Sequence, residues 1–370
     1  MQPKAQLLGL PSYEPGKPIE EVKKELGLTK IIKLASNENP FGSSPKVTEA
    51  IKDAASQTAI YPDGYARTLR QAVAKTYRVK EDQLIFGNGS DEVIQFLCRT
   101  FLEKGTNTVT AHPTFSQYKL NATIEGASIR EVPLKDGVHD LDAMLEAIDE
   151  NTKIVWVCNP NNPTGTYVNK EAFENFLNQV PPHVIVVSDE AYYEYVTADD
   201  YPETIPMLER YKQLIILRTF SKAYGLAALR VGFGVANKEL ISYLQPVRPP
   251  FNNVSFGQIA AAAALSDQEF IKECVEKNNT GMKQLELFCD RHRLTYYPSE
   301  TNFLLIELGR SGDEVFKALL KEGFIVRSGN PLGFSTAIRI TIGKKEDNEA
   351  LFQALERVLL QTPLTTTQPS

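Results

Sequence analysis

Lys222 is the residue whose position most directly indicates covalent chemistry. It lies in the stretch RTFSKAYGLAALRVGFG, directly after an apolar segment, and Arg230 follows eight positions later. A lysine amine is nucleophilic only when it is deprotonated, and burial near another cation lowers its pKa enough for it to form a Schiff base with a carbonyl group. A lone lysine in a loop is more often simply solvated, so the neighbouring motifs decide between the two interpretations.

A tight turn and a carboxylate follow two other apolar segments. The turn NPNNPTG, residues 159–165, comes directly after KIVWVC, and Asp189 comes directly after the apolar run 184–188. An ordinary tight loop also contains such residues, and an exposed loop acid is usually just hydrated. A carboxylate beneath a pyridine ring, however, keeps the ring nitrogen protonated, which makes the ring an electron sink for a carbanion.

The segment LIFGNGSDEVIQFLCRTF predicts an anion site at the start of a helix. An apolar strand runs into a glycine-rich turn, and an amphipathic helix begins near Ser90 and Asp91. Free backbone N–H groups at a helix start bind phosphate well. The motif alone is weak, because GNGSDE lacks the third glycine of a dinucleotide fingerprint and the chain has no G-x-x-x-x-G-K-[ST] motif.

These residues are positioned by a mainly parallel sheet covered by helices. Short apolar, β-branched segments alternate with helical stretches, which is typical of an α/β fold. The predicted strands are residues 83–86, 106–110, 152–158, 184–188, 214–219 and 231–235. Ligands of such sheets bind at the carboxyl ends of the strands, where the polar clusters fall. The sequence therefore predicts one shared site.

The pattern changes after Pro249 and Pro250. An alanine-rich helical stretch follows, and predicted strands near residues 301–306, 324–326 and 337–342 then indicate a smaller α+β domain. We therefore expect an N-terminal arm over residues 1–36, a large cofactor-binding domain over 37–250, a small C-terminal domain over 251–360 and a disordered tail over 361–370.

Composition argues against several other classes of protein. The formal net charge of the 370 residues is -6, so we expect no nucleic-acid partner. Proline and charge interrupt the start of the chain, and no later run approaches the roughly 20 apolar residues that span a bilayer, so we expect a cytoplasmic protein without a membrane anchor. The four cysteines and four histidines form no C-x-x-C or H-E-x-x-H pair, so we expect no metal site.

The chain resembles the fold-type I pyridoxal-phosphate aminotransferases. The motifs GSDE, NPNNPTG, DEAYYEY and SKAYGLAALRVG occur in that family's order, and they are followed by Arg327 and by Arg339 in IRITIG. Within the family, LASNENPFG, YPDGYARTLRQAVA and GNGSDE look like the histidinol-phosphate aminotransferase branch. The resemblance runs from Leu10 to about Leu360, and it departs from the family at Ala228, where the pattern L-A-G-x-R usually has glycine.

The resemblance implies a fold and a cofactor. The fold would be an α/β fold-type I transferase, with a mainly parallel seven-stranded sheet in the large domain and a smaller α+β C-terminal domain. The cofactor would be pyridoxal 5′-phosphate, with Lys222 as its Schiff-base lysine and catalytic base and Asp189 as the partner of its ring nitrogen. The remaining implied cofactor contacts are Asn162 and Tyr192 at the phenolic oxygen, Ser90, Asp91, Ser221 and Arg230 at the phosphate, Phe115 on the ring face, and Tyr61, which would reach the neighbouring subunit's phosphate in a homodimer with shared active sites.

The resemblance also implies the substrates. Tyr13, Asn162, Arg327 and Arg339 match substrate contacts, with the two arginines as an anion clamp. The reaction would be transamination of L-histidinol phosphate with 2-oxoglutarate to imidazole acetol phosphate and L-glutamate, a step of histidine biosynthesis. An aromatic amino-acid aminotransferase stays an alternative, because Arg339 could equally bind an α-carboxylate. A threonine-phosphate decarboxylase is a second alternative, and a non-catalytic cofactor-binding protein is a third.

Overall fold

Seven strands form the central sheet of the larger part, in the order β2-β8-β7-β6-β5-β3-β4. The computed structural model describes residues 2–10 and 19–361. Of these seven strands only β8 runs in the opposite direction, antiparallel to both β2 and β7, so the predicted mainly parallel seven-stranded sheet is confirmed. The strands are β2 Leu84–Gly87, β3 Asn107–His112, β4 Ser128–Pro133, β5 Thr152–Cys158, β6 Ile185–Asp189, β7 Leu214–Thr219 and β8 Gly232–Ala236.

The middle strands are buried on both faces because helices cover both sides of the sheet. Along β5, Val155 and Val157 belong to one hydrophobic core, whereas Ile154 and Trp156 belong to the core on the other face. Successive side chains of a strand point to opposite faces, so a strand buried on both sides needs an unbroken apolar run. The run KIVWVC meets that requirement, which explains why its strand could be predicted.

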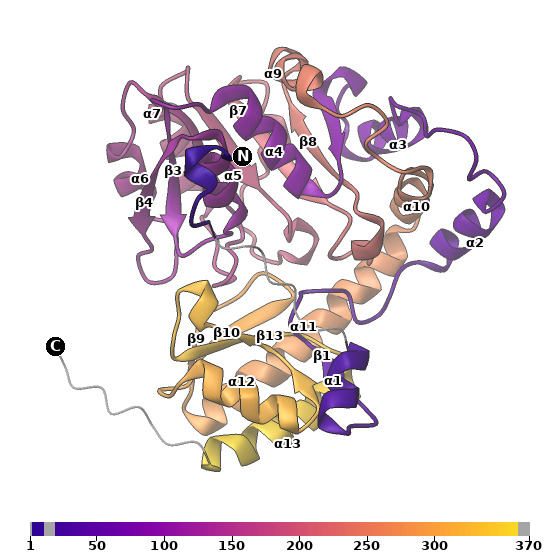
Figure 1. Ribbon diagram of the computed structural model, residues 1–370, viewed down its shortest axis with the longest axis vertical. Coiled ribbons are helices and arrows are strands. Elements are labelled where there is room, and N and C mark those ends of the chain that lie inside the picture. The colour runs from indigo at the N-terminus through magenta and orange to yellow at the C-terminus, as the bar shows by residue number, and fades with distance from the viewer. Residues whose placement is uncertain (1, 11–18, 362–370) are drawn as a thin grey trace.

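Helices pack on both faces of the large sheet (Figure 1). The helices of the larger part are α2 Pro45–Ala54, α3 Arg67–Tyr77, α4 Ser90–Phe101, α5 Gln117–Glu125, α6 Leu141–Glu146, α7 Lys170–Gln179, α8 Thr204–Met207, α9 Lys238–Leu244 and α10 Ser255–Leu265, with 3-10 turns η1 Ala5–Leu7, η2 Glu81–Gln83, η3 Tyr193–Tyr195, η4 Ala227–Leu229 and η5 Gln245–Val247. Side-chain caps begin several of them: the Asn169 side chain accepts from Ala172 N at the start of α7. Among the helices of the described residues, none is both long and apolar enough to cross a lipid bilayer.

The smaller part, below the large sheet in Figure 1, is built on a four-stranded antiparallel sheet in the order β12-β13-β10-β9. Its elements are α11 Gln268–His292, β9 Thr295–Tyr296, β10 Phe303–Glu307, α12 Gly312–Lys321, β11 Phe324–Ile325, β12 Arg327–Ser328, η6 Asn330–Leu332, β13 Ala337–Thr341 and α13 Lys345–Gln361. The three helices share a separate hydrophobic core with β10 and β13. This agrees with the α+β composition expected for the end of the chain.

The N-terminal residues contact both parts. In η1, Gln6 Nε2 donates to the backbone oxygen of Ile124 in α5, at 3.0 Å. Farther along, helix α1, Ile19–Leu26, lies beside the smaller part, and strand β1, Ile32–Lys33, pairs in parallel with β11. The chain as far as Lys33 therefore ends on the smaller part.

The predicted domain boundaries stay predictions. Helix α10 follows the expected boundary near residue 250, yet it packs against α2 and α3, and its residues Ala260 and Ala261 belong to the core of the large sheet. In α11, Ile271 still belongs to that core, whereas Leu285 and Cys289 belong to the core of the smaller part. The long helix α11 thus passes from one core to the other.

Candidate active site

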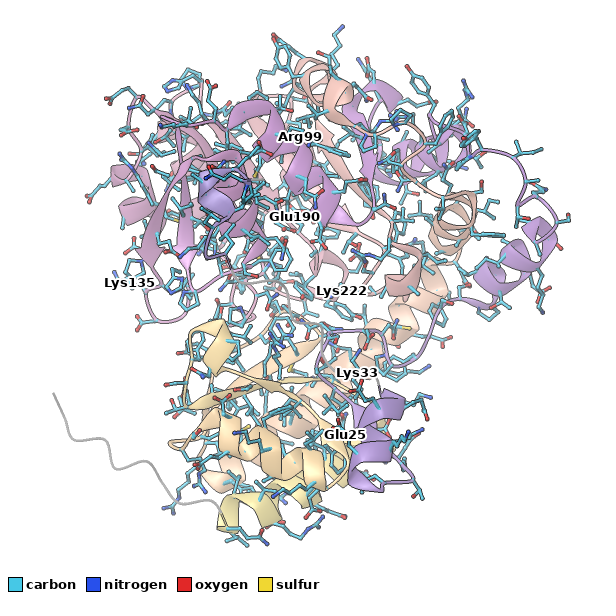
Figure 2. All side chains as sticks on the ribbon, viewed as in Figure 1. Glu25, Lys33, Arg99, Lys135, Glu190 and Lys222 are labelled. Carbon is cyan, nitrogen blue, oxygen red and sulfur yellow. The ribbon has the colours of Figure 1, made fainter. Side chains whose placement is uncertain are left out.

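A cavity of about 820 Å³ lies where the two parts meet. It is formed at the carboxyl ends of β5, β6 and β7, where α/β sheets bind their ligands, and Figure 2 shows Lys222 at this junction. The predicted site residues that line it are Ser90, Asp91, Phe115, Asn162, Asp189, Tyr192, Ser221, Lys222, Arg230, Arg327 and Arg339. Residues far apart in the sequence thus converge on one space.

Lys222 lies in the loop that follows β7, with its side chain partly buried in the cavity wall. Its Nζ donates to the backbone oxygen of Ser36 at 3.3 Å. Burial, reinforced by the nearby charge of Arg339, lowers the pKa of Lys222 from 10.5 to about 8. A substantial fraction of the amine is therefore neutral, and so nucleophilic, near pH 8.

Asp189 ends β6 and is 3% exposed. Its Oδ2 accepts a hydrogen bond from the Tyr118 hydroxyl at 2.6 Å, whereas Oδ1 is buried with no hydrogen-bond partner among the described residues. Burial raises the pKa of Asp189 from 3.8 to about 7, and the hydrogen bond from Tyr118 opposes this shift. A buried carboxylate with one free oxygen is suited to accept a hydrogen bond from a cationic ring nitrogen.

Asn162 and Arg339 meet across the cavity, although they belong to the two different parts. Arg339, on β13, donates through Nη1 to Asn162 Oδ1 and through Nη2 to the backbone oxygen of Ala35, the latter at 2.9 Å. Burial lowers the pKa of Arg339 from 12.5 to about 10. On the antiparallel partner strand β12, Arg327 lies directly opposite Arg339 and also lines the cavity. The two guanidinium groups make this wall suitable for an anion.

The start of α4 forms a second place for an anion. Arg230 Nη1 donates to Ser221 Oγ at 3.1 Å, and Arg230 Nη2 is paired with Asp91 Oδ2 at 3.2 Å. Gly89, just before the helix, has a φ of 76°, and a Cβ atom there would lie 2.6 Å from Arg230 Nη2. Glycine is thus required for the guanidinium to lie against the helix start, beside the free N–H groups of its first turn.

Two aromatic residues complete this side of the cavity. Phe115 lines it and packs edge-on against Tyr118, with ring centroids 5.6 Å apart. Tyr192 is buried, and its hydroxyl accepts a hydrogen bond from Asn37 Nδ2 at 2.8 Å. A flat ligand could therefore lie between the Phe115 ring and the polar groups of this wall.

One predicted site residue of the described part of the chain lies elsewhere. Tyr61 is 79% exposed, stacks on Phe251 at a centroid distance of 4.8 Å and falls outside the cavity lining found in the described part of the chain. Tyr13 belongs to residues 11–18, outside the described residues.

Sequence reasoning missed several residues that support the site. Tyr118 follows Phe115 by three positions in the stretch HPTFSQY, the spacing that brings helical side chains together, and this could have identified it. Asn37 lies in the quoted motif LASNENPFG, but nothing local shows that it reaches Tyr192, which is 155 residues away. Arg218, a charge inside the apolar strand LIILRT, signalled the buried ion pair that it forms with Glu190 at 2.7 Å.

Comparison with known proteins matches residues 29–355 to the family described as aminotransferase class I and II. The histidinol-phosphate aminotransferase of Halalkalibacterium halodurans is 66% identical over 361 residues, which cover 98% of each chain. That of Geobacillus thermodenitrificans is 62% identical over 365 residues, or 99% of this chain and 100% of the relative. The crystal structure of histidinol-phosphate aminotransferase from Sinorhizobium meliloti, in complex with pyridoxal-5′-phosphate, superposes with a TM-score of 0.88 at 28% identity over 97% of each chain.

Proposed function

This chain belongs to the class I and II aminotransferase family, and we propose that it transfers the amino group of L-histidinol phosphate to 2-oxoglutarate with pyridoxal 5′-phosphate as its cofactor. The products are imidazole acetol phosphate and L-glutamate, and the step belongs to histidine biosynthesis. Similarity to histidinol-phosphate aminotransferases along nearly the whole chain supports this substrate. The strongest structural support is the partner-free Oδ1 of Asp189 on the same cavity as Lys222, as found among the described residues.

The residues of the cavity fit the parts of this cofactor. Lys222 would be its covalent attachment, and Asp189 Oδ1 would accept the hydrogen bond from its ring nitrogen. The other proposed contacts are Asn162 and Tyr192 at the phenolic oxygen, Ser90, Asp91, Ser221 and Arg230 around the phosphate, and Phe115 against the ring face. When bound, the cofactor supplies a protonated pyridine ring that withdraws electrons from the substrate's Cα.

Lys222 has a second role in this proposal, as the base. With the cofactor bound, Lys222 Nζ would be the group that takes the proton from the substrate's Cα. A pKa near 8, set by burial and by Arg339, lets the amine both accept and return a proton near neutral pH. The backbone oxygen of Ser36, 3.3 Å from Nζ, holds the freed amine close to the cavity.

Arg327 and Arg339 allow one pocket to serve two substrates. Histidinol phosphate has no carboxylate but carries a phosphate, whereas 2-oxoglutarate and glutamate carry two carboxylates. Guanidinium groups bind both kinds of oxyanion through paired hydrogen bonds. The cross-strand position of the two arginines supports this shared clamp.

The assembly in this proposal is a homodimer with shared active sites. Ile60, Tyr61 and Tyr65 are exposed between α2 and α3, and Phe251 and Val254 are exposed as well. Tyr61 and Phe251 stack on each other, which brings the two segments into one apolar surface. Such surfaces are typical of protein interfaces. In the dimer, Tyr61 reaches the cofactor phosphate of the neighbouring subunit.

The cytoplasmic location and the division into an arm, a large domain and a small domain also remain proposals. The division is supported by the separate cores of the two sheets.

The amino donor is tested by measuring glutamate formed from 2-oxoglutarate with purified, cofactor-loaded enzyme. Histidinol phosphate should be used with a kcat/KM at least about tenfold above that of phenylalanine, since a phosphate offers the two guanidinium groups more charge and more acceptor oxygens than a single carboxylate does. Preference for phenylalanine would instead identify an aromatic aminotransferase. Release of carbon dioxide from threonine phosphate would identify a decarboxylase, and inertness towards every donor would identify a non-catalytic protein.

A further inference from the structure

Asn37 occupies a constrained position between the two parts of the molecule. It is 2% exposed and has a φ of 56°, in the left-handed region that residues other than glycine rarely adopt. Its backbone N–H donates to Thr341 Oγ1 at 3.0 Å, and its carbonyl accepts from Asn302 Nδ2 at 3.0 Å. Both partners belong to the smaller part, whereas Tyr192, the partner of its side chain, belongs to the larger part.

The hydrogen bonds around Asn37 fix which way its side-chain amide points. The Thr341 hydroxyl accepts from the Asn37 backbone and donates to Asn37 Oδ1 at 3.0 Å. With Oδ1 facing Thr341, the opposite end of the amide, Nδ2, donates to the Tyr192 hydroxyl at 2.8 Å. The Tyr192 oxygen is thereby an acceptor towards Asn37, and its own hydrogen is left to donate elsewhere.

Tyr192 lines the cavity, so that hydrogen is available to a ligand there. We propose that Asn37 is a positioning residue that directs the Tyr192 hydroxyl hydrogen towards the phenolic oxygen of the cofactor. This inference rests on the proposed function, because it needs pyridoxal 5′-phosphate in the cavity. Thr341, which orients Asn37, lies two residues after Arg339 on the same strand, β13. The strand that carries the anion clamp is therefore connected to the hydrogen bond that the cofactor receives.

The effect on the cofactor follows from where charge develops. A hydrogen bond to the phenolic oxygen stabilises the negative charge on that oxygen. This charge is least compensated when the linkage between Lys222 and the cofactor has lost its proton. Losing the hydrogen bond therefore raises the pH at which the linkage loses its proton, and it weakens binding of the cofactor.

Asn37→Gly tests this role with little disturbance of the backbone. Glycine adopts a positive φ readily and retains both backbone hydrogen bonds, so the substitution removes mainly the amide. With the enzyme loaded with pyridoxal 5′-phosphate, the pH midpoint of the visible absorbance change should rise by about half a unit to one unit, and the Kd of the cofactor should rise about three- to tenfold. As a matched control, Asp136→Gly replaces an exposed residue with a φ of 52° and should change neither value.

A second variant protects the test against misfolding. Thr341→Val has nearly the same shape but lacks the hydroxyl that orients Asn37, so it should shift the midpoint in the same direction by a smaller amount. Tyr192→Phe should shift it at least as much as Asn37→Gly. In the Tyr192→Phe background, Asn37→Gly should add nothing, because the two residues act through one hydrogen bond.

Three results would overturn the inference. The first is an unchanged midpoint in both Asn37→Gly and Thr341→Val while Tyr192→Phe shifts it. The second is a full additional shift from Asn37→Gly in the Tyr192→Phe background, which would show that Asn37 acts independently of Tyr192. The third is no shift in Tyr192→Phe. None of these results would contradict the proposed function, which fails only if the cofactor-loaded enzyme does not use histidinol phosphate as its amino donor.

Discussion

Asp189 and Glu190 are adjacent carboxylates, both buried, with opposite surroundings. Asp189 faces the cavity, and its Oδ1 has no hydrogen-bond partner in the described structure. Glu190 is 0% exposed and has both oxygens occupied. Its Oε1 accepts from Ser188 and Thr204, and its Oε2 accepts from Arg218 through Nε and Nη2 at 3.1 and 2.7 Å. Figure 2 shows Glu190 inside the larger part and Lys222 at its junction with the smaller part.

The difference separates a carboxylate that is available to a ligand from one that holds the fold. A buried polar atom without a partner costs free energy, whereas a buried carboxylate with both oxygens hydrogen-bonded fixes the local structure. Neighbouring residues at a strand end point to opposite sides, which is how two acids next to each other in sequence reach such different surroundings. Substitutions on the cavity side should therefore affect catalysis, and those on the other side should affect stability.

The largest effect is expected at Lys222, which shares the cavity with Asp189. Lys222→Ala removes the proposed covalent attachment and the proposed base, so transamination should fall by more than about 10⁴-fold while pyridoxal 5′-phosphate still binds noncovalently. Steady-state rates and cofactor titration measure the two properties. Lys33→Ala is a matched control, because Lys33 also lines the cavity but is paired with Glu38 at 3.0 Å. Near-normal turnover in Lys222→Ala would refute the assignment.

Asp189→Asn should lower kcat by about 10²- to 10³-fold, because an amide cannot keep the ring nitrogen protonated. Stability should not suffer, since the substitution removes a desolvated carboxylate. Steady-state rates of the cofactor-loaded enzyme measure kcat, and urea unfolding of the cofactor-free protein measures stability. A variant that is inactive only because it is unfolded would contradict the distinction between the two acids.

The same carboxylate predicts a pH dependence. Because the folded-state pKa of Asp189 is raised from 3.8 to about 7, the folded protein holds this proton more tightly than the unfolded chain. Its contribution to the free energy of unfolding is therefore favourable at low pH and is lost as the pH rises from about 4 to about 7. Urea unfolding of the cofactor-free protein at several pH values gives the free energy of unfolding. As the pH rises, this free energy should decline less steeply in Asp189→Asn than in the parent. If the free energy of unfolding depends on pH equally in both proteins, a group other than Asp189 has the raised pKa.

On the other side of the comparison, Glu190→Gln should lower the free energy of unfolding by about 3 kcal/mol, because it leaves the buried charge of Arg218 without its partner. Activity per folded, cofactor-loaded molecule should stay within about threefold of the parent, a change no larger than that of losing one neutral hydrogen bond. Urea unfolding and active-site titration measure the two quantities. A large loss of kcat at unchanged stability would remove the contrast with Asp189.

A smaller effect is expected at Tyr118, whose hydroxyl holds Asp189 in place. Tyr118→Phe keeps the ring stacked on Trp156, where the centroids are 4.7 Å apart, but removes the hydrogen bond to Asp189. Since that bond lowers the pKa of Asp189, its loss should raise this pKa further and reduce kcat about three- to tenfold, with little change in KM. A change confined to KM would argue against an effect of Tyr118 on catalysis through Asp189.

The smallest effect is expected at Tyr61, outside the cavity of its own chain. Tyr61→Phe should weaken cofactor retention about threefold if its hydroxyl bonds a phosphate across the dimer. Tyr65→Phe, at another exposed tyrosine of the same loop, is the control. Equal retention in the two variants would leave Tyr61 as a packing partner of Phe251.

The parts of the fold that sequence predicted share a physical cause. Strands such as β5 and β7 are buried on both faces, so they appear as apolar runs, and the polar residues after them mark the ligand edge. The edge strand β4 was missed because SIREVP has only Val132 buried, so it carries no such run. The domain boundary near α10 was harder to predict than any strand. An alanine-rich helix has no hydrophobic stripe that indicates which core it joins.

The long-range links of the site were beyond local reasoning. Asn162 and Arg339 are 177 residues apart, and neither neighbourhood encodes the hydrogen bond between them. The side-chain orientation of Asn37 depends on Thr341, 304 residues later. By contrast, the common location of Lys222 and Asp189 could be predicted, because each follows a strong strand signal and belongs to a motif with a fixed place in the family's order, and both line the cavity.

The most direct test of the central claim is a half-reaction followed by visible absorbance. Histidinol phosphate is added to cofactor-loaded enzyme without an acceptor, and 2-oxoglutarate is added afterwards. The account predicts rapid loss of the band of the Lys222-linked cofactor and its return with 2-oxoglutarate, with Lys222→Ala unable to complete either change. A parent enzyme that shows no such band, or whose band bleaches only with phenylalanine, would contradict it.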